Sequence, residues 1–248
     1  MPFEPAAVPE LSLRDVHVWR IDIEHPPAGL DLLEILSPDE RTRAARFVRP
    51  PDRQRYTVSH AGMRVVLGAY LGIPTERVEF TARPGGKPEL APAAGSSPLR
   101  FNLSHSDGLA MLAVARQREV GVDVERIRPF DDVDNLVHRY FAPGERAQWN
   151  LLSVDERLPA FFRCWTRKEA YLKARGIGLS TGLDQFEVSF SPDEPARLVW
   201  SADATDSACR WSFCDVSPNA GYMAACVVEP ELDRLSVFDW PTAAISHR

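Results

Sequence analysis

The segment Gly121-Val122-Asp123-Val124-Glu125 restricts the local fold strongly, because its apolar and acidic residues alternate strictly. Such alternation is typical of a β-strand, in which successive side chains point to opposite faces. We predict a strand whose valines pack on one face and whose carboxylates, Asp123 and Glu125, leave from the other. Taken alone, these two acids would be interpreted as a solvated pair on the open face of an edge strand.

About forty residues further on, the segment WTRKEAYLK at 165–173 is predicted to be helical. Trp165, Glu169 and Lys173 are four residues apart and therefore share a helix face. If Glu169 converges with Asp123 and Glu125, the three carboxylates form an oxygen site suited to Mg²⁺, with Mn²⁺ as an alternative. The alternative for Glu169 and Lys173 is a surface pair worth about 0.3–0.5 kcal/mol. We expect Trp165 to pack in the core.

Three motifs in this order resemble the signature of the 4'-phosphopantetheinyl transferases, namely FNLSHS at 101–106, GVDVE at 121–125 and WTRKEAYLK at 165–173. Together with Gly86-Lys87-Pro88 they are similar to the long, monomeric type known from the surfactin synthetase activator. The resemblance runs from roughly residue 38 to residue 188. It implies an α+β fold of two similar halves, related by a pseudo-twofold axis, with the active site at their interface. We place the halves at 1–117 and 118–248.

The resemblance implies transfer of 4'-phosphopantetheine from coenzyme A to a serine of an acyl, polyketide or peptidyl carrier protein, with release of adenosine 3',5'-bisphosphate. Asp123, Glu125 and Glu169 would hold Mg²⁺. Asp123, Glu169 and Lys173 would be catalytic, with Glu169 taking the serine proton directly or through a water, and Lys173 contacting the phosphates. The resemblance also includes Lys168, which the helical period alone predicts to be a solvated lysine pointing away from Lys173.

The same resemblance implies the residues that contact coenzyme A. Ser104 and His105 would contact the substrate, Lys87 would lie near its adenine and 3'-phosphate end, and Arg43 and Arg55 would hold the 3'-phosphate. Arginine suits a terminal phosphate because its guanidinium can donate to two oxygens. Ser104 and His105 also raise the possibility of a serine hydrolase, but no GxSxG elbow surrounds the serine.

One position departs from the family pattern. Close relatives carry a further basic residue ahead of Arg43, where this chain has Glu40, and the neighbouring Arg41 is a candidate substitute. The stretch 41–64 is rich in arginine, which favours an anionic ligand in a chain of net charge −6. For any single one of these arginines, a solvated helix face is the simpler interpretation.

Composition limits the remaining classes. A net charge of −6 gives no electrostatic support to a nucleic-acid partner. No apolar run approaches the ~20 residues that span a membrane, and the first residues lack the features of a secretory signal, so we expect a cytoplasmic location. The resemblance to the two-half, long type implies a monomer. The four cysteines have neither CxxC nor zinc-ligand spacing, which predicts free, mostly buried thiols.

The segment 126–140 mixes apolar residues with arginines directly after the acidic strand. We predict either a docking surface for the carrier protein or an ordinary amphipathic helix packed on the core. Two other functions stay open, namely a non-catalytic coenzyme A-binding module and a hydrolase or phosphatase that uses the same metal. The intact set of three carboxylates and Lys173 argues against a pure binding module.

Periodicity and turn residues predict the remaining elements. Gly176 and Gly178 should end the motif helix, 91–98 should be a loop, and the last dozen residues a tail. Ser37 and Asp52 should cap two helices. The predicted strands are 16–23, 78–80, 99–103, 109–115, 120–125, 186–190, 196–200, 210–216 and 222–228, and the predicted helices are 30–36, 38 onward, 52–71, 133–140, 143–152 and 158–175.

Overall fold

The structure is a computed structural model that describes residues 8–83, 85–91, 98–177, 182–204 and 206–240. The chain forms two compact units. Unit 1 consists of the described residues up to Arg83, those of Pro88–Gln117, and those from Asp233 onward. Unit 2 consists of the described residues of Pro84–Lys87 and of Arg118–Leu232. Helices and strands occur in both units, so the predicted α+β class is confirmed.

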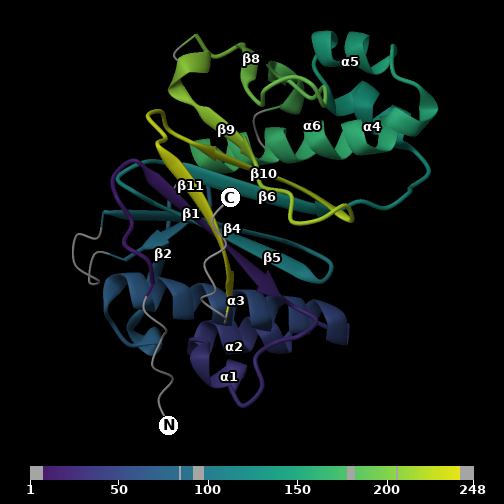
Figure 1. Ribbon diagram of the computed structural model, residues 1–248. Coiled ribbons are helices and arrows are strands. Elements are labelled where there is room, and N and C mark those ends of the chain that lie inside the picture. Colours follow the sequence, from purple (N-terminus) through teal and green to yellow (C-terminus); the bar gives the residue numbers. More distant parts are fainter. Residues whose placement is uncertain (1–7, 84, 92–97, 178–181, 205, 241–248) are drawn as a thin grey trace. The chain divides into compact units, whose positions relative to one another are not determined.

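Unit 1 is built on a four-stranded sheet of order β11-β1-β5-β4 (Figure 1). Strand β1 pairs antiparallel with β5 and parallel with β11, the strand nearest the end of the chain. The sequence predicted that the last residues of β11 belong to a tail and that the whole segment belongs to the second half. Both expectations are wrong for this strand, which pairs with β1 and belongs to unit 1. The sheet strands are β1 (Asp15–Asp22), β4 (Leu99–Ser106), β5 (Leu109–Arg116) and β11 (Arg234–Trp240).

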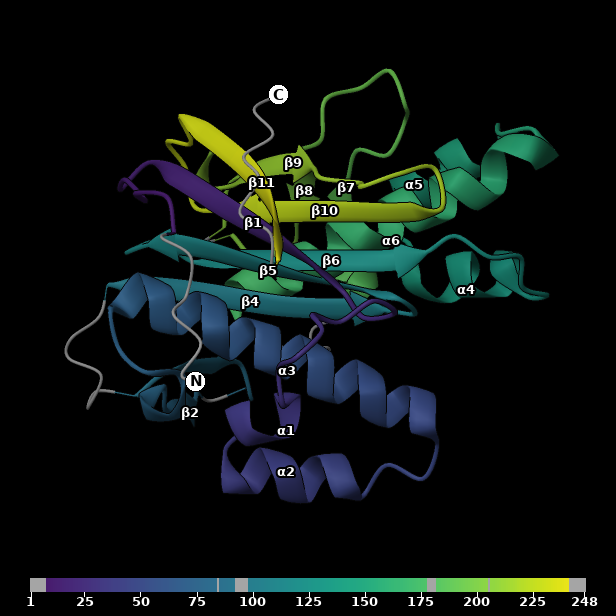
Figure 2. The ribbon, with the colours of Figure 1, turned by 60° about the horizontal axis from the view of Figure 1, so that its bottom comes forward.

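The long helix of unit 1 is α3 (Pro50–Leu71), which lies along this sheet (Figure 2). It begins after Arg49, so Asp52 lies in its first turn and the predicted cap at Asp52 is wrong. The preceding helix begins as predicted, with Ser37 and Glu40 forming a capping box. The shorter elements of the unit are α1 (Leu32–Ile35), α2 (Pro38–Ala45), η1 (Thr75–Arg77), β2 (Phe80–Ala82) and β3 (Pro88–Leu90).

Unit 2 has a three-stranded antiparallel sheet of order β6-β10-β9 and a two-stranded sheet of β7 and β8. Helix α6 packs across β6 and β10 (Figure 2). It ends at Gly176, whose φ of 68° is the left-handed conformation that glycine adopts readily. The elements are β6 (Val120–Arg126), α4 (Val133–Tyr140), α5 (Pro143–Trp149), α6 (Val154–Arg175), η4 (Leu183–Gln185), β7 (Phe186–Val188), β8 (Leu198–Ser201), η5 (Ala208–Arg210), β9 (Ser212–Asp215) and β10 (Tyr222–Val228).

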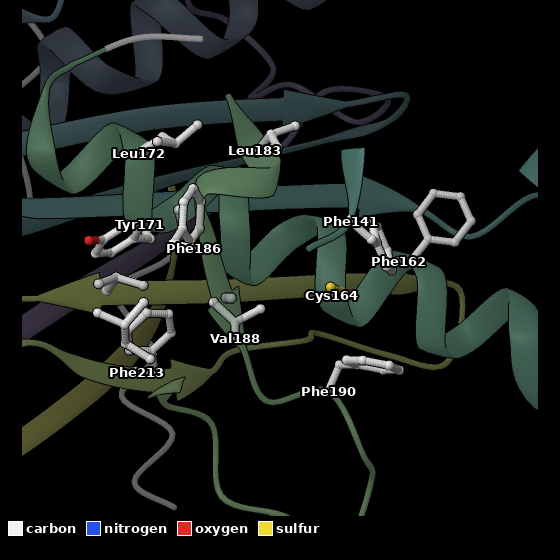
Figure 3. Close-up of a cluster of buried hydrophobic side chains, with 14 of the residues drawn as sticks. Phe141, Phe162, Cys164, Tyr171, Leu172, Leu183, Phe186, Val188, Phe190 and Phe213 are labelled. Carbon is white, nitrogen blue, oxygen red and sulfur yellow. The ribbon is translucent and has the colours of Figure 1, made fainter. Parts of the chain in front are cut away.

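The core of unit 2 is rich in aromatic side chains, several of which surround α6 (Figure 3). Phe141 and Phe161 stack with ring centroids 5.8 Å apart. Cys164 is buried in the same cluster, and burial raises the pKa of its thiol well above the ordinary value. Cysteines 164, 209, 214 and 226 are all free thiols, as predicted, although Cys209 is exposed.

Among the described residues, no helix is both long and apolar enough to cross a membrane. The predicted end of the motif helix at Gly178 and most of the predicted loop at 91–98 lie outside the described residues.

Candidate active site

Helix α6 and strand β6 approach each other closely at Gly121. A Cβ atom on Gly121 would lie 2.1 Å from the carbonyl oxygen of Ala170 and 2.3 Å from the backbone nitrogen of Ala174, far inside van der Waals contact. Glycine on the strand and two alanines one helical turn apart therefore let the two backbones meet. Asp123 follows shortly after Gly121, and Glu169 and Lys173 immediately precede the two alanines.

This approach brings the predicted acidic strand and the predicted helix together. The Nζ atom of Lys173 lies 2.5 Å from Oδ1 of Asp123, whose side chain is only 4% exposed. Burial raises the pKa of Glu169 to about 7, with a further increase from the charges of Asp123 and Glu125 and an opposing decrease from Lys173. Asp123 is thus not a solvated residue on an open strand face, and that alternative interpretation is wrong.

The chemistry of this donor set fits a hard divalent cation. All three carboxylates offer oxygen ligands, which Mg²⁺ prefers. The negative charges of Asp123 and Glu125 disfavour ionisation of Glu169, and a bound cation would reduce this repulsion. Over the described ranges, no set of three or more His, Cys, Asp or Glu side chains is already arranged as a metal cluster. The ammonium group of Lys173 contacts Asp123 in this structure.

The residue before Glu169 has a structural contact that the helical period did not predict. Lys168 is fully buried, and its Nζ donates to the carbonyl oxygens of Leu183 and Phe186 at 2.8 and 2.6 Å. It also pairs with Glu145 at 2.8 Å, so the prediction of a solvated lysine is wrong. Burial raises the pKa of Glu145, and Lys168 opposes that increase. This pair fixes α6 immediately next to Glu169.

Arg167, a further member of the motif, is 1% exposed. It donates through Nη2 and Nε to the Asp215 carboxylate at 2.8 and 3.3 Å, and through Nη1 to the carbonyl oxygen of Ser189. Trp165 packs between aromatic neighbours, with ring centroids 5.6 Å from Phe161 and 5.8 Å from Tyr140, as predicted. Apart from Glu169 and Lys173, the motif thus holds the helix in place.

Lys87, predicted to contact coenzyme A, is nearly buried in unit 2. Its Nζ lies 3.0 Å from the Glu119 carboxylate and donates to the carbonyl oxygens of Val120 and Ala174, also at 3.0 Å. Ala174 lies in the last turn of α6, where carbonyl groups lack helical partners. These contacts give Lys87 a structural role, and its contact with the nucleotide stays a prediction.

Four predicted ligand residues belong to unit 1. Ser104 is buried and His105 exposed near the end of β4, where His105 pairs with Ala110 of β5. Arg55 of α3 donates through Nε to the carbonyl oxygen of Asp107 at 3.2 Å, and so holds the turn that joins these two strands. Its Nη1 donates to the carboxylate of Asp52 at 3.0 Å.

The fourth residue, Arg43, lines a pocket of about 660 Å³ on α2 and the loop that follows, together with Asp39, Thr42, Arg46 and Phe47. Its guanidinium lies 5.6 Å from the ring centroid of Tyr56. The pocket therefore offers two guanidinium groups and an aromatic ring, but also one carboxylate.

The departure at Glu40 has a structural reason. Arg64 donates through Nε to Oε2 of Glu40 at 2.5 Å, and Nδ1 of His60 lies 3.2 Å from Oε1. Burial would raise the pKa of Glu40, but hydrogen bonds from His60, the Ser37 N–H and Arg64 lower it to about 2. Glu40 thus ties α2 to α3. Arg64 is buried in this contact and does not belong to a solvated basic patch.

Several apolar side chains of 126–140 pack against the core and are only partly exposed. Ile127, Phe130, Leu136 and Tyr140 are partly buried against the core of unit 2, which favours the amphipathic-helix interpretation for them. The exposed residues in this segment include Arg126 and Arg128.

Sequence comparisons define the class of protein. The family model for the 4'-phosphopantetheinyl transferase superfamily matches residues 119–227, and the model for a 4'-phosphopantetheinyl transferase N-terminal region matches residues 28–117. The chain is 40% identical over 223 residues to the 4'-phosphopantetheinyl transferase HetI of Nostoc sp., covering 89% of this chain and 91% of that protein. The chain therefore belongs to the 4'-phosphopantetheinyl transferase superfamily.

Two further relatives are similar over most of their length. A putative 4'-phosphopantetheinyl transferase of Synechocystis sp. is 37% identical over 174 residues, which is 70% of this chain and 69% of that protein. The 4'-phosphopantetheinyl transferase Sfp of Bacillus subtilis is 26% identical over 200 residues, 80% of this chain and 85% of that protein.

Proposed function

We propose that this chain transfers 4'-phosphopantetheine from coenzyme A to a serine hydroxyl of an apo carrier protein of the acyl, polyketide or peptidyl type. In this reaction the serine oxygen forms a bond to the β-phosphorus of coenzyme A. The bond from that phosphorus to the bridging oxygen breaks, and adenosine 3',5'-bisphosphate leaves. Membership of the family supports this reaction.

The observation that carries the proposal within the structure is the arrangement of Asp123, Glu169 and Lys173 where α6 meets β6. Phosphoryl transfer requires positioning and stabilisation of charge on phosphate oxygens. Lys173 supplies a cation for those oxygens. Glu169 supplies a carboxylate, the type of group that accepts the serine proton once it is ionised.

Asp123, Glu125 and Glu169 are the residues proposed to hold Mg²⁺, with Mn²⁺ as the alternative. When bound, the cation would neutralise charge on the pyrophosphate. The all-oxygen donor set supports this assignment. The proton of the serine would be taken by Glu169, directly or through a water.

On the coenzyme A side, we assign Arg43 and Arg55 to the 3'-phosphate and Ser104 and His105 to further contacts with the substrate. The pocket beside Arg43 and the exposed position of His105 support these roles. The 22-residue helix beside a sheet in each unit is consistent with two similar halves. Their pseudo-twofold relation, a site at their interface, a monomeric state and a cytoplasmic location stay predictions.

The test is intact-protein mass spectrometry of apo carrier proteins incubated with coenzyme A, Mg²⁺ and this protein. A carrier should gain the mass of one phosphopantetheine group with the wild type. The gain should slow by about a hundredfold or more with Asp123→Asn, because a carboxylate proposed to hold Mg²⁺ is lost. Asp193→Asn is the matched control, since Asp193 is an exposed acid of unit 2.

Chelation with EDTA should stop the reaction, and added Mg²⁺ should restore it. No mass gain on acyl, polyketide or peptidyl carriers would contradict the proposal and favour a coenzyme A-binding protein. Release of free phosphopantetheine without a modified carrier would favour a hydrolase.

A further inference from the structure

The contact between Lys173 and Asp123 assigns Lys173 a second partner besides the phosphates. The two side chains differ in mobility and exposure. Asp123 is fixed on β6 within a paired sheet and its side chain is 4% exposed, whereas that of Lys173 is 28% exposed. Lysine also has a long flexible stem. In any exchange of partners, the carboxylate would stay in place and the ammonium group would move.

A divalent cation and this ammonium group compete for the same carboxylate. Lys173 Nζ lies 2.5 Å from Oδ1 of Asp123, so a metal bound to that oxygen would share it with a second positive charge and be repelled by it. A metal that arrives alone therefore competes with Lys173 for a nearly buried anion. A metal that arrives with a pyrophosphate supplies Lys173 with a new anionic partner.

We propose that Lys173 is an internal counter-ion that occupies Asp123 until a divalent metal and a pyrophosphate group bind together, so that each raises the affinity of the protein for the other. This inference rests on the proposed function, because it takes Asp123 as a metal ligand. By linkage, the metal and the pyrophosphate must raise each other's affinity by the same factor. The site then binds free metal more weakly when coenzyme A is absent.

The experiment measures Mn²⁺ binding by electron paramagnetic resonance, with and without saturating coenzyme A. Wild type should bind Mn²⁺ about five- to a hundredfold more tightly when coenzyme A is present. Lys173→Gln should bind Mn²⁺ alone more tightly than wild type and should lose most of this enhancement. Lys173→Arg keeps the charge and should behave like wild type.

Arg157→Gln is the matched control, since it removes one positive charge from the same helix at a residue that pairs with Asp134. It should leave Mn²⁺ binding unchanged. Equal Mn²⁺ affinity in wild type and Lys173→Gln, with transfer activity intact in wild type, would overturn this inference alone. Failure of wild type to bind Mn²⁺ even with coenzyme A would overturn both the inference and the proposed metal dependence.

Discussion

At the scale of single residues, the motif on α6 separates into side chains that face the proposed chemistry and side chains that anchor the helix. Lys168 belongs to the second group, because its ammonium group has two carbonyl oxygens and the Glu145 carboxylate within 2.8 Å. Glu145 in turn accepts hydrogen bonds from the backbone N–H groups of Ala142 and Val188. One buried ion pair thus connects α6 to α5 and β7.

Lys168→Met should lower the free energy of unfolding by about 3–5 kcal/mol, because it leaves the Glu145 carboxylate buried without its cation. Urea unfolding followed by circular dichroism measures the change. The double variant with Glu145→Gln should recover part of the loss, since the buried negative charge is then absent. A loss below about 1 kcal/mol in the single variant would contradict a structural role for this pair.

Sequence periodicity could predict that Asp123 and Glu125 share a strand face and that Glu169 and Lys173 share a helix face, because local geometry sets each face. It could not predict the surroundings of Lys168. The groups that cover this lysine come from η4, β7 and α5, and their position depends on tertiary packing that no local pattern reports. The same holds for Arg64, whose partner Glu40 lies on another helix.

At the scale of elements, the site depends on how closely α6 lies against β6. Gly121 permits this approach because any side chain there would overlap the backbone of α6. The pattern of one glycine on the strand and two alanines four residues apart on the helix was the sequence signal for it.

Gly121→Ala should destabilise unit 2 by about 3 kcal/mol or more, because a methyl group 2.1 Å from the Ala170 carbonyl oxygen forces the helix away. It should also reduce transfer activity, since Lys173 and Glu169 move with α6. Thermal unfolding and the mass-spectrometric transfer assay measure the two effects.

Gly29→Ala serves as the comparison, because an added Cβ at Gly29 would have no atom within 4 Å. The backbone of Gly29 has a positive φ of 83°. The substitution should cost only about 1 kcal/mol of backbone strain. Equal effects of the two substitutions would show that the close approach at Gly121 is not needed.

Most elements were predictable because they carry their own periodicity, and α4 and β10 have the predicted bounds. The strand β11 was not predictable in this way. Its role depends on pairing with β1 near the other end of the chain, for example Phe238 with Trp19. Composition and local pattern contain no information about such a distant partner.

At the scale of the whole molecule, one buried histidine of unit 1 should make the stability of the fold sensitive to acid. His17 of β1 is 3% exposed, and its Nδ1 lies 2.6 Å from the hydroxyl of Tyr70, which also accepts a hydrogen bond from Trp19. Burial lowers the pKa of His17 to about 4, with Arg234 adding to the decrease and Asp15 opposing it. The folded protein therefore keeps this histidine neutral.

Between pH 6.5 and 4 the unfolded chain binds a proton at His17 that the folded chain does not. The contribution of His17 is thus fully present above pH 6.5 and should be lost as the pH falls to about 4, by about 3 kcal/mol in total. Urea unfolding at a series of pH values, followed by tryptophan fluorescence, measures this slope.

His17→Gln should be less stable at neutral pH but should lose less stability on acidification than wild type. His25→Gln is the control, because His25 is an exposed histidine that pairs with Asp22. The same pH dependence in wild type and His17→Gln would contradict the assignment.

The parallel pairing of β1 with β11 also sets an order of events during synthesis. Residues 234–240 leave the ribosome after all of unit 2, more than a hundred residues later than the segment Leu109–Arg116, which pairs with the other edge of β1. At ribosomal rates this delay is on the order of ten seconds. During that time β1 has one edge without its strand, and such an edge can pair with other chains. The speed of translation through unit 2 therefore fixes how long the nascent protein is exposed to misassembly.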